Sequence, residues 1–198
     1  MDKYFKKGIQ VLKKLHEAGY EAFFVGGYVR DMLLGIKSSD IDITTSALPE
    51  EVINIFDHVK ETGKKYGSVT VIIDEFKYEV TTFRSDGEYN DKRRPESVEY
   101  TKNLKSDLNR RDFTINALVM DSKEIIYDNF NSKEDLEKRI IRTINDPFKR
   151  FEEDSLRILR AFRFVSKIGF DIEEKTLEAM KELASSVKNI SIERVMVE

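Results

Sequence analysis

The sequence contains no cysteine and only two histidines in its 198 residues. The chain therefore forms no disulfide and no thiolate metal site, which fits the reducing cytoplasm. Both histidines lie in amphipathic helical stretches, so we do not expect a zinc site. A metal in this protein would have to be a hard cation bound by oxygen atoms, and Mg²⁺ is the first candidate.

Long apolar runs are also missing. None approaches the roughly 18 residues that a membrane helix needs, and the N-terminal segment has no apolar centre like that of a secretory signal. We therefore expect no membrane partner. The net charge is −3, so any surface that binds nucleic acid must be a local basic patch. The composition, 40% hydrophobic and 36% charged, predicts a folded core under a charged surface.

Hydrophobic spacing predicts an α/β fold, with a small mixed sheet flanked by helices in residues 1–146 and an all-helical segment in residues 147–198. Strands are predicted at 21–25, 39–46, 68–74, 76–84 and 124–130, the third and fourth as a hairpin. Helices are predicted at 2–18, 28–35, 48–59, 103–121, 132–144, 148–169, 173–187 and from 191 onward. The helix at 132 would begin with a capping box from Ser132 to Asp135. Residues 85–100 are polar and predict a loop.

The strand at 39–46 carries Asp40 and Asp42 on one face, because side chains alternate along a strand. Two carboxylates about 7 Å apart along a strand can share one Mg²⁺ or bridge two. An Asp-x-Asp pair alone is more typical of a solvated strand end than of a metal site. On the hairpin strand, Glu79 faces away from Tyr78 and Val80. It is a candidate third carboxylate, which would complete the metal site or orient an attacking hydroxyl, or else a surface residue in a salt bridge.

Gly26 and Gly27 lie between a buried strand and a short helix, where backbone N–H groups can bind phosphate. Arg30 follows in the first helical turn and can donate two hydrogen bonds to phosphate oxygens. A Gly-Gly pair alone would indicate an ordinary turn, but the nearby Asp-x-Asp makes a phosphate site the better interpretation. In the segment NRRDFTINA, Arg111 is then a candidate triphosphate contact and Asp112 a candidate ribose or orienting contact.

Arginines recur every three residues in the segment EEDSLRILRAFRF. Asp154, Arg157, Arg160 and Arg163 would form a ridge along one helix, beside an apolar ridge. A solvated charged face gives the same pattern, but the large apolar neighbours favour a ridge that faces a ligand. Cytosine and adenine both present an amino donor beside a ring-nitrogen acceptor. Asp154 and Arg157 could therefore select these two bases, since uracil and guanine would leave the pair unsatisfied.

Five segments resemble, in order, the motifs of class II tRNA nucleotidyltransferases, the family of CCA-adding enzymes. They are GGYVRD…DIDITTS, YEVTTFR, NRRDFTINAL, EDSLRILRAFRF and SIERVMVE. The resemblance implies a polymerase-beta-like nucleotidyltransferase head at residues 1–146 and a helical neck at 147–198 that recognises the base. Family members continue into body and tail domains that hold tRNA. The last helix has no stop signal before Glu198, so we expect a longer parent protein.

The resemblance also implies the reaction, which is template-independent transfer of CMP and AMP from CTP and ATP to the 3′ end of tRNA, with release of pyrophosphate. It assigns the predicted residues to metal, phosphate and base: Asp40 and Asp42 to Mg²⁺, Gly27, Arg30 and Arg111 to the phosphates, Asp154 and Arg157 to the base, with Arg160 and Arg163 completing the pocket.

Two alternatives stay open at this point. A-adding enzymes and poly(A) polymerases share the motifs, although the loop DGEYNDKRRPESV and the stretch TGKKYGSVTV are closer to the CCA type. A nucleotide- or RNA-binding module without chemistry is the other alternative, against which the retained Asp40, Asp42, Arg30 and Arg111 argue. The chain departs from the family at Ser132, where glycine is usual.

Overall fold

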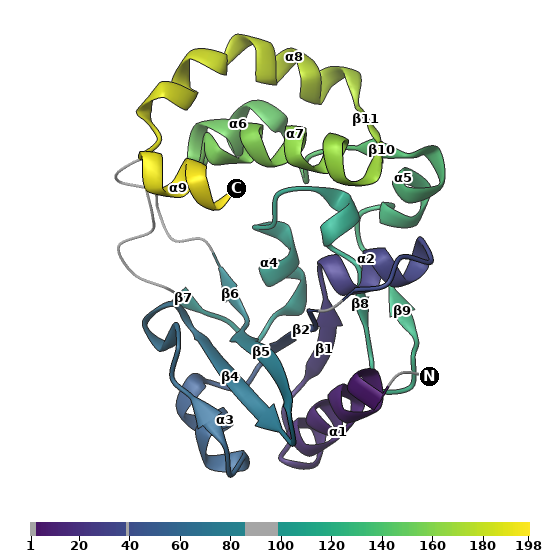
Figure 1. Ribbon diagram of the computed structural model, residues 1–198, viewed down its shortest axis with the longest axis vertical. Helices are drawn as coiled ribbons and strands as arrows, with labels where there is room; N and C mark the ends of the chain where they lie inside the picture. The colour runs from purple at the N-terminus through teal and green to yellow at the C-terminus, as the bar shows by residue number, and fades with distance from the viewer. Residues whose placement is uncertain (1–2, 39, 86–98) are drawn as a thin grey trace.

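A seven-stranded mixed sheet forms the centre of the computed structural model, which describes residues 3–38, 40–85 and 99–198 (Figure 1). The strand order is β3-β4-β5-β2-β1-β8-β9, and only β2 and β5 run parallel. The strands are β1 (Ala22–Val25), β2 (Asp42–Thr45), β3 (Val59–Lys60), β4 (Ser68–Ile73), β5 (Phe76–Thr82), β8 (Val119–Met120) and β9 (Ile126–Tyr127). The predicted fold class is confirmed, and so is the hairpin of β4 and β5.

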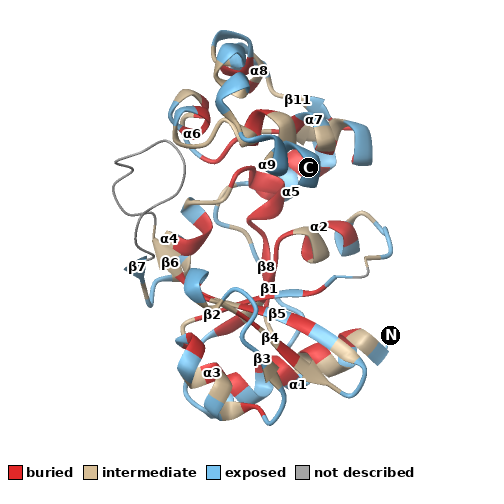
Figure 2. Ribbon diagram, turned by 60° about the vertical axis from the view of Figure 1, so that its left-hand side comes forward, coloured by how far each residue is buried: buried red, intermediate tan, exposed pale blue. Residues whose placement is uncertain are grey.

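Helix α1 (Lys3–Glu17) packs against β1 and β5 through a stripe of residues at helical spacing. The stripe consists of Phe5, Gly8, Val11, Leu12 and Leu15, all buried. Helix α3 (Pro49–Ile55) lies beside α1 and against β4. Figure 2 shows the buried residues running through the central strands and along the inner sides of these helices.

The helices of the C-terminal quarter lie together at the end of the molecule opposite α1 and α3 (Figure 1). They are α6 (Pro147–Glu153), α7 (Leu156–Ile168), α8 (Glu174–Glu182) and α9 (Ile192–Val197), with a 3₁₀-helix at Ala184–Asn189. The sequence predicted one helix over 148–169, but the chain breaks between α6 and α7. Asp154 there has an extended backbone, with φ −153° and ψ 103°. The segment also contains β11 (Asp171–Ile172), which pairs with β10 (Ile140–Ile141), so it is not purely helical.

The helix predicted over 103–121 is wrong beyond its first six residues. Helix α4 (Leu104–Asn109) ends before Arg110, and a 3₁₀-helix at Thr114–Asn116 then leads into β8. The reason is burial on all sides: Phe113, Ile115, Ala117 and Leu118 are fully buried, whereas a helix with one packed face would expose part of this run.

The capping box at Ser132 is also wrong. Helix α5 (Ser132–Lys138) follows Asn131, which has φ 57°, and the carboxylate of Asp128 accepts from the backbone N–H groups of Ser132 and Lys133. Asp135 bonds instead to Thr114 and Arg142.

The loop predicted at 85–100 falls mostly on residues outside the described ranges. The strands at its two ends, β6 (Arg84–Ser85) and β7 (Glu99–Tyr100), pair with each other. Elsewhere, helix α2 (Gly27–Leu33) forms where the sequence predicted a helix over 28–35.

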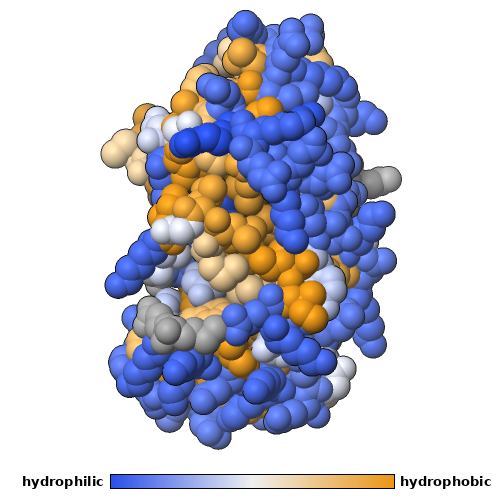
Figure 3. Space-filling view, turned by 90° about the vertical axis from the view of Figure 1, so that its right-hand side faces the viewer, coloured by the Kyte–Doolittle hydropathy of each residue, from blue (hydrophilic) through white to orange (hydrophobic). Residues whose placement is uncertain are grey.

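Hydrophobic residues gather across the middle of one face of the molecule (Figure 3). Among the described residues, exposed apolar side chains occur in and just after α2, at Met32, Leu33 and Ile36, and around β9, at Ile125 and Tyr127. Both elements lie on the side of Figure 1 that Figure 3 turns to the viewer. In the part of the chain that the structure describes, no helix is both long enough and apolar enough to cross a bilayer.

We expect Gly8→Ala to destabilise the protein although alanine favours a helix by about 1 kcal/mol. A Cβ at Gly8 would lie 2.9 Å from Phe24 Cε1 and 3.2 Å from Tyr78 Cε1, and both rings are fully buried. Overpacking of this kind costs roughly 1–3 kcal/mol, so urea denaturation should show a net loss of about 1 kcal/mol. Gln10→Ala, on the exposed side of α1, is the control and should change stability by less than about 0.5 kcal/mol. A more stable Gly8→Ala protein would contradict this packing.

Candidate active site

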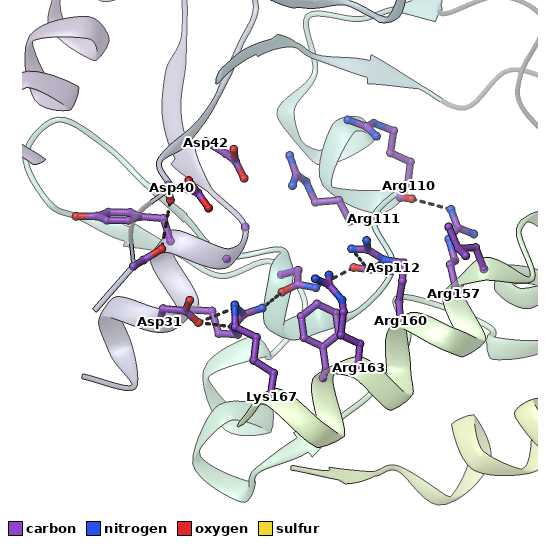
Figure 4. Close-up of a pocket in the computed structure, with 18 of the residues that line it drawn as sticks. Asp31, Asp40, Asp42, Arg110, Arg111, Asp112, Arg157, Arg160, Arg163 and Lys167 are labelled. Carbon is purple, nitrogen blue, oxygen red and sulfur yellow. Dashed lines mark hydrogen bonds and ion pairs between the residues drawn. The ribbon is translucent and has the colours of Figure 1, made fainter. Parts of the chain in front are cut away.

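One cavity of about 550 Å³ lies between the sheet and the C-terminal helices. Figure 4 shows Asp40 and Asp42 on one side and Arg110, Arg111, Arg157 and Arg160 on the other, with Asp112 among these arginines. Of the twelve residues predicted for the site, eleven line this cavity, and only Glu79 does not: Gly26, Gly27, Arg30, Asp40, Asp42, Arg111, Asp112, Asp154, Arg157, Arg160 and Arg163. The early acidic pair and the arginine ridge more than 100 residues later therefore face the same space.

Gly26 brings the backbone close to two charged side chains at the end of β1. Its φ of 73° and ψ of −135° lie in a region that only glycine adopts without strain. A Cβ there would lie 3.5 Å from Arg111 Nη1 and 3.9 Å from Asp42 Oδ2. Glycine is therefore required by the backbone conformation more than by lack of space.

The acidic side of the cavity lies at the start of β2. Asp42 pairs in register with Glu79 on the parallel strand β5, and Asp40 lies just before the strand. Burial, together with repulsion from Glu79 and Asp40, raises the pKa of Asp42 to about 6 against the opposing effect of Arg111. A carboxylate in this environment favours a bound cation, so the pair fits a hard metal ion.

The structure does not identify a third protein ligand for a metal ion beside Asp40 and Asp42. Among the described residues, no three carboxylates or histidines gather closely enough to form a metal-binding group. Glu79 acts on Asp42 through its charge, and its role as a third ligand stays a prediction. Tyr4 was not predicted: its hydroxyl accepts from Ile41 N at 3.1 Å and donates to Lys77 O at 2.8 Å. It thereby fixes the peptide between Asp40 and Asp42.

Asp107, which the sequence did not single out, holds the phosphate-facing arginines. Its side chain is fully buried. Oδ1 accepts from Arg110 Nε and Nη2 at 2.9 and 2.7 Å, and Oδ2 accepts from Arg111 Nη2 at 3.3 Å and Thr44 Oγ1 at 3.1 Å. Burial alone would raise the pKa of Asp107, but Arg111 and Arg110 outweigh it and lower the pKa. One carboxylate therefore ties strand β2 to both arginines.

Arg111 reaches the cavity with part of its guanidinium unsatisfied. Its Nε is buried and has no hydrogen-bond partner among the described residues, and its Nη1 lies beside Gly26. Burial lowers the pKa of Arg111, with partial compensation from Asp107. A polyanion in the cavity would supply the missing acceptor.

Arg30 is more deeply engaged than the sequence suggested. It is 2% exposed, and its Nε and Nη2 donate to Asp31 Oδ1, at 2.8 and 2.6 Å. Its Nη1 donates to Asn116 Oδ1 at 2.6 Å, and Asn116 in turn donates to Asp112. In this structure the Arg30 guanidinium therefore organises the wall of the cavity.

Asp112 links that wall to helix α7. Its carboxylate accepts from Phe113 N, from Asn116 and from Arg160 Nε, the last at 2.7 Å. Burial would raise the pKa of Asp112, but Arg160 and the hydrogen bonds outweigh it and lower the pKa. Arg160 also pairs with Glu198 at 2.9 Å, and Arg163 pairs with the same carboxylate at 2.8 Å.

The predicted base-reading pair lies where α6 gives way to α7. Arg157 Nη1 donates to Arg150 O and to Glu153, and its Nη2 donates to Arg110 O at 3.1 Å. The carboxylate of Asp154 accepts from Leu156 N at 3.1 Å and from Arg194 Nη2 at 2.8 Å. Arg194 is a further cavity residue that the sequence did not reveal, because it lies 40 residues from its partner on another helix.

Comparison with known proteins places this geometry in a family. Residues 22–142 match the family described as "Poly A polymerase head domain", and residues 169–198 match "Probable RNA and SrmB-binding site of polymerase A". The chain belongs to the poly(A) polymerase head-domain family. The resemblance read from its motifs is thus confirmed.

The relatives of this head-domain chain include CCA-adding enzymes. It is 52% identical to the "CCA-adding enzyme" of Lactobacillus helveticus over 98% of this chain and 49% of that protein, and 48% identical to that of Geobacillus thermodenitrificans over 98% and 48%. It therefore spans about half the length of the curated relatives that it matches.

Solved structures give the same picture. The Bacillus stearothermophilus CCA-adding enzyme in complex with CTP has a TM-score of 0.91 at 44% identity, over 98% of this chain and 47% of that one. The Thermotoga maritima CCA-adding enzyme complexed with tRNA has a TM-score of 0.78 at 27% identity, over 98% and 46%. The fold and the order of the elements are thus shared with these enzymes.

Without added metal, Asp42→Asn should stabilise the protein at neutral pH. The folded-state pKa of about 6 lies above the ordinary aspartate value of 3.8, so the ionised carboxylate costs stability as pH rises through this window. We expect the variant to unfold a few degrees above the wild type at pH 7.5 and at the same temperature at pH 4, by circular dichroism. Asp57→Asn, at an exposed aspartate, is the control. Equal melting temperatures at pH 7.5 would contradict the raised pKa of Asp42.

Asp107→Asn should strongly destabilise the protein, because it leaves Arg110 and Arg111 without their buried counterion. Removing one partner of a buried pair costs about 3–5 kcal/mol, measured by urea denaturation at pH 7. The lowered pKa of Asp107 stabilises the fold above the unfolded-state value, and this stability is lost as pH falls through the folded-state pKa. The two proteins should therefore converge in acid. Glu50→Gln, at an exposed ion pair with Lys64, should cost less than about 1 kcal/mol. A loss that small for Asp107→Asn would contradict its role.

Proposed function

We propose that this chain is the nucleotide-holding half of a CCA-adding enzyme, which transfers CMP and AMP from CTP and ATP to the 3′ end of tRNA and releases pyrophosphate. The observation that carries the proposal is the single cavity between the acidic pair and the arginines. In this assignment residues 1–146 form the catalytic head, and residues 147–198 form a neck that recognises the base. The names of the relatives support the same reaction.

The triphosphate would lie along the arginine side of the head, with Arg111 as its principal contact. Among the described residues, Arg111 Nε has no hydrogen-bond partner, and Gly26, which has no side chain, lies beside Arg111 Nη1. Asp40 and Asp42 would hold Mg²⁺, which when bound acts as a Lewis acid on the phosphates. Glu79 pairs in register with Asp42 but does not line the cavity, so its role in orienting the attacking hydroxyl stays a prediction.

In the reaction, the 3′ hydroxyl of the tRNA gives its proton to water, and its oxygen forms a bond to the α-phosphorus while the bond from that phosphorus to the bridging oxygen breaks. Pyrophosphate leaves with the electron pair, and negative charge grows on the phosphates beside the arginines. Because Asp107 holds Arg110 and Arg111 in place before the substrate arrives, their charge stabilises the transition state without reorganisation.

Base selection would fall to Asp154 and Arg157. Asp154 would accept from the exocyclic amine of cytosine or adenine, and Arg157 would donate to the adjacent ring nitrogen. Arg157 would exchange one of its present partners, such as Arg110 O, for the base. Uracil and guanine present a carbonyl beside an N–H, which leaves both side chains unsatisfied.

Nucleotide binding tests this proposal on the chain itself. With Mg²⁺, we expect isothermal titration calorimetry to give CTP and ATP dissociation constants about tenfold or more below those of UTP and GTP, since one unsatisfied buried group costs about 1–3 kcal/mol. Asp57→Asn should behave like the wild type, and Asp42→Ala should weaken binding in Mg²⁺. Equal affinity for all four nucleotides would rule out the base-reading scheme.

The product distinguishes the CCA reaction from its relatives. The chain would be joined to the remaining C-terminal half of the Lactobacillus helveticus relative and incubated with tRNA that lacks its 3′ CCA. Incorporation of CTP followed by one adenosine supports CCA addition. Adenosine incorporation alone, or long adenosine tails, would indicate an A-adding enzyme or a poly(A) polymerase. Nucleotide binding without any extension would favour the non-catalytic module.

A further inference from the structure

Arg194 fixes the carboxylate of Asp154 from outside the helix that carries it. Asp154 Oδ2 accepts from Arg194 Nη2 at 2.8 Å, and Asp154 Oδ1 accepts from Leu156 N at 3.1 Å. With one anchor on each oxygen, the carboxylate plane has a defined orientation. One anchor is local to the start of α7, whereas the other comes from α9, 40 residues later.

In the part of the chain that the structure describes, ion pairs hold α9 and few of its apolar side chains are buried. Ile192, Met196 and Val197 are 76%, 79% and 86% exposed. The contacts that hold this helix across the cavity include the ion pairs of Glu198 with Arg160 and Arg163, at 2.9 and 2.8 Å. Arg194 itself is half-buried and lines the cavity. Ion pairs therefore fix α9 at Glu198, after its C-terminal end, and Arg194 on the same helix contacts Asp154.

We infer that Arg194 is a positioning residue for base selection, which holds Asp154 in the orientation that accepts a hydrogen bond from the amino group of cytosine or adenine. This inference rests on the proposed function. The lone pairs of Asp154 that its two anchors leave free are available to a base. If Arg194 were removed, only the contact with Leu156 N would remain among the described residues, and the side chain could rotate away from the amino group. Affinity for the correct bases should then fall, while binding of the phosphates should not change.

A purely electrostatic role for Arg194 makes a different prediction. An arginine on the cavity wall that attracted the triphosphate by its charge would weaken CTP, UTP and inorganic tripolyphosphate together when removed. A residue needed only for folding would lower the melting temperature and weaken every ligand through loss of folded protein. The choice among these roles therefore depends on which ligands are affected.

The experiment measures binding of CTP, UTP and inorganic tripolyphosphate to the chain by calorimetry, in Mg²⁺. The variants are Arg194→Met, Arg194→Lys, Asp154→Ala and the Asp154→Ala/Arg194→Met double variant. Lys188→Met is the matched control, because it removes one positive charge from an exposed position close in the sequence that does not line the cavity. Circular dichroism confirms that each variant is folded at the temperature used.

We expect Arg194→Met to weaken CTP about tenfold, as for loss of one charge-assisted hydrogen-bond constraint. Tripolyphosphate and UTP should change less than about twofold, so selectivity for CTP over UTP should fall. In the Asp154→Ala background, Arg194→Met should have little further effect, since residues that act through one another are not additive. Arg194→Lys should recover part of the loss, and Lys188→Met should bind like the wild type.

Two results would overturn the inference while leaving the proposed function intact. One is an equal loss of CTP and tripolyphosphate affinity in Arg194→Met. The other is an Arg194→Met effect on CTP that is undiminished in the Asp154→Ala background. A wild-type chain that binds CTP no tighter than UTP would instead overturn the proposed function, and this inference with it.

Discussion

Each buried guanidinium around the cavity needs a carboxylate, and this constraint shapes the rest of the site. Seven of the arginines that line the cavity are ion-paired with carboxylates: Arg30, Arg110, Arg111, Arg157, Arg160, Arg163 and Arg194. Taking a charge out of water is costly unless it is paired. The cavity can therefore concentrate positive groups for a polyanion because the protein supplies matching negative groups behind them.

The pairing also leaves two groups, one basic and one acidic, that an incoming ligand could satisfy. Asp107 forms ion pairs with both Arg110 and Arg111. The buried Nε of Arg111 nevertheless has no hydrogen-bond partner among the described residues. On the opposite side, Asp42 faces Glu79 in register and carries a raised pKa. A ligand with phosphates beside Arg111 and a cation beside Asp42 would relieve both imbalances. A nucleoside triphosphate bound with its metal has this charge pattern.

Local patterns in the sequence predicted the parts of the site that depend on neighbours in the chain. The alternation in DIDITTS and the glycines after FFV placed Asp42 and Gly26 correctly on the cavity wall. The sequence did not reveal Asp107, Asn116 or Arg194, because each acts through a partner far away in the chain or in a buried network. Asp107 looks like an ordinary polar residue of an amphipathic helix, and only the fold brings it beneath Thr44.

The single helix predicted over 148–169 is wrong at Asp154, and the break bears on the proposed base specificity. The spacing of Asp154 and Arg157 suggested one helix, in which residues three apart are neighbours and would pair with each other. Asp-Ser before an apolar run is in fact a typical helix start, and the chain breaks there. Because of this break, Arg157 turns to Glu153 and to Arg110 O, while Asp154 turns to Arg194. The two side chains remain separate acceptor and donor, which a base with an amino group beside a ring nitrogen can satisfy together. In the proposed function, base selection by protein side chains would therefore depend on α6 ending one residue before Asp154.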